Sequence, residues 1–281
     1  MTIATTGATG QLGRLVVAGL KTKVAAEQLV ALVRSPLKAG ELGIAARAAD
    51  YAKPETLAGA LAGIDTLLLI SSSELGQRAA QHRNVIAAAR KTGVKRIAYT
   101  SLLHADISPI SLAAEHRDTE GVLKESGIAY TILRNGWYTE NYTASLKGAI
   151  AAGALVGTSG DGKISSATRA DYAEAAVRVL TSQGHEGKIY ELAGDDSWTM
   201  AGLAREVSRQ TGKTIPYNNL SAADYATALV GMGLPDAIAR AIAGWGIDAS
   251  RGALFDDGRQ LSRLIGRPTT PLAAAVTAAL E

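Results

Sequence analysis

Three glycines near the N-terminus, Gly7, Gly10 and Gly13, constrain the fold of this chain more than any other feature of its sequence. They follow a short apolar run and precede a stretch with the apolar spacing of an amphipathic helix. In this context the first glycine permits a tight turn, the second lets the backbone approach a pyrophosphate, and the third lets the helix pack on the strand. The N-terminus of the helix adds N–H donors and the positive end of its dipole. We therefore predict a dinucleotide-binding loop made of Gly7, Ala8, Thr9, Gly10, Gln11, Leu12 and Gly13.

Arg34 lies at the end of the second expected strand. NAD-preferring domains carry an acid at this place, about 20 residues after the loop, for the ribose 2′-hydroxyl. A guanidinium suits a 2′-phosphate instead, because it is a planar fork of donors that stays charged at pH 7. Only its position at the strand end marks Arg34 as a cofactor contact, so the alternative is that Arg34 is an ordinary surface arginine. The sequence predicts NADPH as the cofactor.

The first half of the chain alternates β-branched-rich runs with amphipathic stretches, which is typical of repeated βαβ units. Helices are expected over residues 11–21, 54–61, 78–92 and 112–126, with Gly93 and Gly127 as C-terminal caps. Strands are expected over residues 2–6, 28–33, 45–49, 65–70, 96–100 and 130–133. The pattern predicts an α/β fold with a Rossmann doubly wound parallel sheet.

Beyond residue 135 the alternation of strand-like and helix-like segments becomes less regular. We expect residues 1–135 to form the NADP-binding Rossmann domain, leaving room for later segments to return to it. Residues 136–281 are expected to form mainly a smaller, substrate-side C-terminal α/β lobe. Its expected elements are a helix over 138–151, a helix opening at 169, a strand over 188–192, a helix over 199–211 and a strand over 214–217.

In an open parallel sheet the ligand lies across the carboxyl ends of the strands, so residues that follow strands are candidate contacts. For the cofactor these are Asp50, Tyr51, Ser71, Ser72 and Ser73, with ordinary polar turns as the alternative. For the substrate they are Tyr99, Asn135 and Trp137. A large ring such as Trp137 also packs well in a core, which is its alternative role.

Composition excludes several kinds of chemistry. The chain has no cysteine, so it has no thiolate nucleophile, disulfide or cysteine-bound metal, and its four histidines show no ligand spacing. We predict no metal. The net charge is +3 without a basic block, which argues against nucleic-acid binding. With no leader pattern and no membrane-length apolar run, we expect a cytoplasmic protein that binds no membrane. The sequence leaves open whether chains pair into homo-oligomers.

The glycine loop, Asp50-Tyr51 and the segment 133–138 resemble the NmrA-like atypical short-chain dehydrogenase/reductases, and the resemblance covers the whole chain. Segments 69–74, 99–106 and 160–164 are similar to the bacterial NAD(P)H:quinone oxidoreductases of type 2, with triphenylmethane reductases as more distant relatives. This resemblance implies reduction of quinones by NADPH. It also implies further cofactor contacts from Tyr138, Thr139, Glu140, Asn141, Tyr142, Thr143 and Arg169.

The Tyr-x-x-x-Lys pair of ordinary short-chain dehydrogenases is missing, since Leu112 and His116 stand at those places. Without that tyrosine, reduction of a ketone lacks its proton donor. A quinone is a strong electrophile that accepts hydride from a positioned nicotinamide, with water protonating the product. His104 and His116 are candidate proton donors, although lone histidines more often pack or face solvent. The missing pair is equally compatible with a non-catalytic, NADP(H)-sensing regulator of the NmrA type that binds a protein partner.

Overall fold

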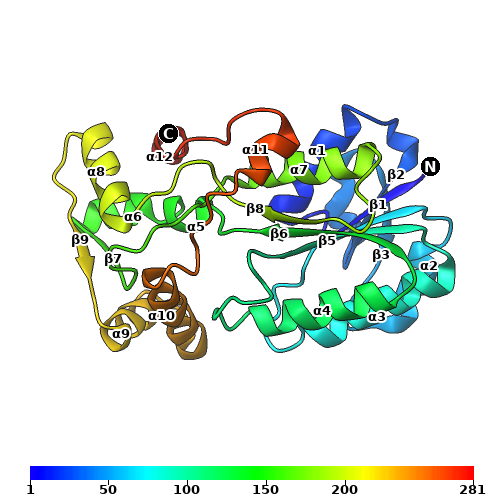
Figure 1. The fold of residues 1–281 in the computed structure, drawn as a ribbon, viewed down its shortest axis with the longest axis horizontal. Coiled ribbons are helices and arrows are strands. Elements are labelled where there is room, and N and C mark those ends of the chain that lie inside the picture. The colour runs from blue at the N-terminus through cyan, green and yellow to red at the C-terminus, as the bar shows by residue number, and fades with distance from the viewer. The chain divides into compact units, whose positions relative to one another are not determined.

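The computed structural model describes all 281 residues and places them in two compact units (Figure 1). The first unit comprises Met1–Asp106, Leu112–Asn135 and Arg169–Leu192. The second comprises Ile107–Ser111, Gly136–Thr168 and Ala193–Glu281. No helix in either unit has the length and apolar character needed to cross a membrane.

A seven-stranded sheet in which every strand pair is parallel forms the centre of the first unit, in the order β3-β2-β1-β4-β5-β6-β8. The order reverses between β1 and β4, which is the switch point where doubly wound folds bind nucleotides. The predicted Rossmann sheet is thereby confirmed. Its strands are β1 (Ile3–Thr6), β2 (Leu29–Val33), β3 (Ala45–Ala48), β4 (Thr66–Leu69), β5 (Arg96–Leu102), β6 (Ala129–Asn135) and β8 (Ile189–Leu192).

Helices cover both faces of this sheet, with α2, α3 and α4 on one face and α1 and α7 on the other (Figure 1). On the first face, Leu67 and Leu69 of β4 pack with Leu57, Val85 and Leu123 from the three covering helices. The four helices predicted for this part of the chain are all present. The helices are α1 (Gln11–Lys21), α2 (Pro54–Leu61), α3 (Arg78–Thr92), α4 (Ala113–Glu125) and α7 (Arg169–Thr181), and the 3-10 segments are η1 (Ala26–Gln28) and η2 (Pro36–Leu42).

Three strands of the main sheet differ from the sequence-based expectation in length or in placement. The pairing of β5 with β6 continues from Arg96↔Ala129 to Leu102↔Asn135, so both strands extend beyond their predicted ends. Tyr99, expected at a strand end, therefore lies in mid-strand. The strand expected over 188–192 joins the main sheet as β8, beside β6, because its backbone completes the hydrogen bonding of that edge.

The second unit contains a parallel pair of short strands, β7 (Leu155–Gly157) and β9 (Tyr217–Asn219), and seven helices. The single helix expected over 138–151 is two helices. The strand expected over 214–217 begins only at its last residue, because Tyr217 is the first residue that pairs with β7. The helices are α5 (Glu140–Thr143), α6 (Leu146–Ala152), α8 (Met200–Thr211), α9 (Ala222–Gly231), α10 (Asp236–Ser250), α11 (Gln260–Ile265) and α12 (Leu272–Leu280).

Candidate active site

The glycine loop between β1 and α1 has the shape that a diphosphate requires. Gly7 adopts a φ of +57°, which favours glycine, and its carbonyl accepts a hydrogen bond from the N–H of Gly10 at 2.9 Å. A Cβ on Gly13 would lie 2.2 Å from the carbonyl oxygen of Gly7, so only glycine lets α1 start this close to the loop. No side chain caps the N-terminus of α1, and its first turn carries no acidic residue. Its N–H donors are thus placed for an anion.

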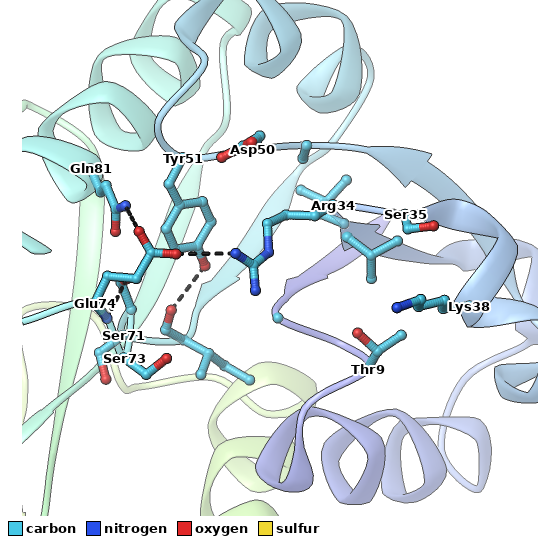
Figure 2. A pocket seen from close by; sticks show the side chains of 16 residues that line it. Thr9, Arg34, Ser35, Lys38, Asp50, Tyr51, Ser71, Ser73, Glu74 and Gln81 are labelled. Carbon is cyan, nitrogen blue, oxygen red and sulfur yellow. Dashed lines mark hydrogen bonds and ion pairs between the residues drawn. The ribbon is translucent and has the colours of Figure 1, made fainter. Parts of the chain in front are cut away.

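Beside this loop the first unit has a cavity of about 450 Å³ at the ends of β1 to β4, shown in Figure 2. Most of the predicted strand-end contacts meet there. The predicted residues that line it are Gly7, Thr9, Arg34, Asp50, Tyr51, Ser71, Ser72 and Ser73. Lys38, Glu74 and Gln81 line the same cavity, although no sequence pattern predicted them as contacts. Of the remaining loop residues, Ala8 and Gly10 precede α1, and Gln11, Leu12 and Gly13 form its start; Ala8 and Leu12 are buried.

Buried polar side chains hold the loop that follows β4. Thr100 accepts from the N–H of Ser71 at 2.9 Å, and His82 accepts through Nε2 from the N–H of Ser72 at the same distance. The Nε atom of Arg78 donates to the carbonyl of Ser72 at 2.7 Å. The backbone of this loop is therefore fixed from both β5 and α3. Polar residues within an apolar strand or on a buried helix face were the sequence signal for these supports.

Tyr51 closes the loop from the opposite side. Its hydroxyl donates to the carbonyl of Ile70 at 2.9 Å, and the N–H of Ile70 donates to Thr6 Oγ1, also at 2.9 Å (Figure 2 shows the tyrosine bond). Thr6 Oγ1 in turn donates to the carbonyl of Leu68. Because the Tyr51 hydroxyl donates its proton to the backbone of Ile70, it anchors this part of the cavity wall.

Tyr99 and His116 are buried inside the first unit. The Tyr99 hydroxyl lies 2.7 Å from His116 Nδ1, and neither side chain is more than 4% exposed. Burial, with a smaller effect from the nearby Arg78, lowers the pKa of His116 to about 2. A side chain in this position neither contacts a substrate nor donates a proton near pH 7. We therefore retain neither the substrate contact predicted for Tyr99 nor the proton-donor role predicted for His116.

Three other predicted residues belong to the first unit, and two of them lie near the ends of β5 and β6. The N–H of His104, which has a φ of +52°, donates to Glu191 Oε2 at 2.8 Å, and its ring is partly exposed. Asn135 is 6% exposed, and its Oδ1 atom is buried without a hydrogen-bond partner. Arg169 begins α7. None of these three lines the cavity of Figure 2.

The second unit has a cavity of its own, of about 380 Å³. Trp137, a predicted substrate contact, lines it, and its ring meets that of Trp245 edge to face at a centroid distance of 5.7 Å. Trp245 is oriented by its Nε1–H, which donates to Ser111 Oγ at 2.9 Å. The full lining is Trp137, Asn141, Tyr142, Val156, Gly157, Thr158, Ser159, Met200, Tyr225, Ile242, Trp245, Gly246 and Leu254.

Residues 138–143, predicted as cofactor contacts, belong to this second unit. Of these residues, Asn141 and Tyr142 line its cavity, and the Tyr142 ring packs edge to face on Trp198 at 4.9 Å. Thr139 and Thr143 are buried, with Thr139 Oγ1 2.8 Å from Ser166 Oγ. The structure thus associates part of this segment with an aromatic cavity.

Comparison with known proteins places this site in a family. The model of a family described as NAD(P)H-binding matches residues 7–183. The chain belongs to this NAD(P)H-binding family. Quinone oxidoreductase 2 of Escherichia coli is 59% identical to it over 278 residues, which cover 98% of this chain and 97% of that protein. These matches confirm the family resemblance found in the sequence.

Solved structures of family members agree with the fold over its full length. The Escherichia coli NADPH-dependent quinone oxidoreductase complexed with NADPH superposes with a TM-score of 0.97, at 57% identity and with 100% of both chains covered. The triphenylmethane reductase of Citrobacter sp. complexed with NADP(H) gives a TM-score of 0.96 at 40% identity, covering 99% of this chain and all of that one.

Proposed function

We propose that this chain is an NADPH-dependent reductase that transfers hydride to quinones. The observation that carries the proposal is a dinucleotide cavity with an arginine at the 2′-phosphate position, in a chain that has Leu112 where ordinary short-chain dehydrogenases have their proton-donating tyrosine. The glycine loop would hold the pyrophosphate, and Arg34 with Lys38 would hold the 2′-phosphate. When bound, the cofactor supplies the hydride.

The protein's own residues favour quinones over ketones as acceptors. Leu112 has no titratable group, and the imidazole of His116 is neutral and already paired with Tyr99. Ketone reduction needs a proton donor at the carbonyl oxygen in the transition state, whereas a quinone takes hydride as a strong electrophile. Binding, orientation and exclusion of water are then what the protein has to provide.

The cavity of the second unit supplies a suitable acceptor site in this proposal. The rings of Trp137, Tyr142, Tyr225 and Trp245 offer flat apolar surfaces to a flat ring, and edge-to-face contacts orient three of them. A volume of about 380 Å³ lies within the usual range of small-molecule sites, roughly 300–1,000 Å³. The side chain of Asn141 adds a polar group for a quinone oxygen.

The comparisons favour this reductase over the NADP(H)-sensing regulator. The most extensive match reported above is to a quinone oxidoreductase over nearly its whole length, and the structural neighbours are reductases solved with NADPH or NADP(H). The cavity of the second unit is lined mainly by aromatic and apolar side chains, which suits a small ring better than a protein surface.

A comparison of two acceptors tests the proposal. Purified protein with NADPH is given a soluble benzoquinone in one reaction and a cyclic ketone of the same ring size in another. We expect quinone-dependent oxidation of NADPH and no turnover of the ketone. Turnover of the ketone at a comparable rate would show that a proton donor exists and would contradict the proposed chemistry.

A further inference from the structure

Glu74 is held in place across the cofactor cavity from Arg34. The loop after β4 brings Glu74 to the cavity wall, and the buried Gln81 of α3 donates through Nε2 to Glu74 Oε2 at 2.7 Å. The other carboxylate oxygen, Oε1, accepts from Arg34 Nη1 at 3.1 Å. In Figure 2 the two side chains approach each other from opposite sides of the cavity. One oxygen of Glu74 is therefore anchored, and the other is directed at the arginine expected to bind the cofactor.

The carboxylate of Glu74 in this ion pair opposes the binding of the 2′-phosphate. The phosphate and Glu74 Oε1 compete for the same guanidinium, and once the phosphate has displaced the carboxylate, two negative groups lie close together. Both side chains are well exposed, at 75% for Arg34 and 48% for Glu74, so solvent weakens the repulsion without removing it. Glu74 is thus expected to lower the affinity for NADPH.

For NADH the same carboxylate has the opposite effect. NADH carries a 2′-hydroxyl in place of the phosphate, and a hydroxyl donates well to a carboxylate. NAD-preferring domains use an acid for this purpose at the end of the second strand, where this chain has Arg34. Glu74 comes from the loop after β4 instead, but its Oε1 lies within hydrogen-bond distance of that arginine.

We infer that Arg34 and Glu74 together set the cofactor preference: Arg34 binds the 2′-phosphate of NADPH, and Glu74 accepts the 2′-hydroxyl of NADH. The pair keeps the cavity open to both cofactors and makes the preference for NADPH smaller than Arg34 alone would give. This inference rests on the proposed dinucleotide binding, but it needs no turnover. If this protein binds both cofactors but reduces no quinone, the proposed function is wrong and the inference about Arg34 and Glu74 still holds.

The test is a binding experiment on Glu74→Gln. A glutamine at this position keeps an oxygen that can accept from Gln81 and replaces the negative oxygen that faces Arg34 with a neutral NH2 group. NADPH and NADH are titrated by nicotinamide fluorescence, and 2′,5′-ADP and 5′-AMP are used as competitors that report the 2′ position alone. Glu41→Gln is the matched control, because Glu41 also pairs with an arginine, Arg14, and does not line the cavity.

We expect Glu74→Gln to bind NADPH and 2′,5′-ADP about two- to fivefold more tightly, the range of an exposed charge pair. The affinity of the same variant for NADH and 5′-AMP should fall by a factor of about two or more. Glu41→Gln should leave the ratio of NADPH to NADH affinity unchanged. Equal changes for both cofactors, or weaker binding of NADPH by Glu74→Gln, would overturn the inference and leave Glu74 as a residue that only shapes its loop.

Discussion

His82 Nε2 accepts a hydrogen bond of 2.9 Å from the backbone N–H of Ser72, in the loop that forms one wall of the cofactor cavity. Its Nδ1 lies 2.9 Å from the hydroxyl of Thr119, which already donates to the carbonyl of Glu115. Nδ1 must therefore carry the proton, and the ring is neutral. A protonated ring would lose the acceptor on which Ser72 depends.

This arrangement predicts a loss of stability in acid. Burial lowers the pKa of His82 from 6.5 to about 3, so between these values the unfolded chain binds a proton that the folded chain does not. The free energy of unfolding therefore rises with pH across this window, by about 1.4 kcal/mol per pH unit for one such group. Urea unfolding at several pH values should give a smaller slope for His82→Gln. An unchanged slope would mean that His82 is not neutral in the folded state.

Gly13→Ala should disrupt the phosphate loop. Its Cβ would lie 2.2 Å from the carbonyl oxygen of Gly7 and 2.8 Å from Ala8 Cα, so the loop or α1 must move. We expect weaker NADPH binding and a lower melting temperature. Gly121→Ala in α4 is the control, because a Cβ there meets nothing within 4 Å, and it should be neutral or stabilising by up to about 1 kcal/mol. Similar behaviour of the two variants would refute the close packing of α1 on the loop.

Arg34→Asp should weaken the binding of NADPH much more than that of NADH. The lost charged hydrogen bond is worth about 1 to 3 kcal/mol, and the new carboxylate would lie beside Glu74. Calorimetric titration with both cofactors measures the difference. If both affinities fall by the same factor, Arg34 does not hold the 2′-phosphate.

Trp137→Ala should raise the KM for the quinone and leave NADPH binding nearly unchanged, because its ring lines the cavity of the second unit and packs on Trp245. Steady-state kinetics at saturating NADPH give the KM, and fluorescence gives the cofactor affinity. A collapse of NADPH binding in Trp137→Ala would instead assign the ring a structural role.

Local sequence signals were enough to predict much of the first unit. The helix over Arg78–Thr92 ends at Gly93 with a φ of +77°, as a glycine cap requires, and the strand–glycine–helix unit around Gly10 has the expected form. Arg34, Asp50 and Ser71 meet in one cavity because parallel strands end at the same edge of the sheet. These features depend on residues close together in the chain or on a general rule of sheet topology.

The remaining features depend on long-range contacts that no local pattern reports. Tyr99 is buried because β5 and β6 pair over seven residues, and the strand ending at Leu192 completes the main sheet only through its pairing with β6. The anchoring of Ser72 by His82, and of Glu74 by Gln81, requires α3 to pack beside the loop after β4. The sequence marks these histidine and glutamine residues only as polar residues on a helix.

NADPH-dependent reduction of quinones can be measured by mixing the purified protein with NADPH and a soluble benzoquinone and following the absorbance of the reduced nicotinamide. Parallel reactions with NADH and without protein are the controls. We expect rapid turnover that is faster with NADPH than with NADH at equal subsaturating concentrations. Tight binding of NADPH without any quinone-dependent oxidation would contradict the proposed reductase activity.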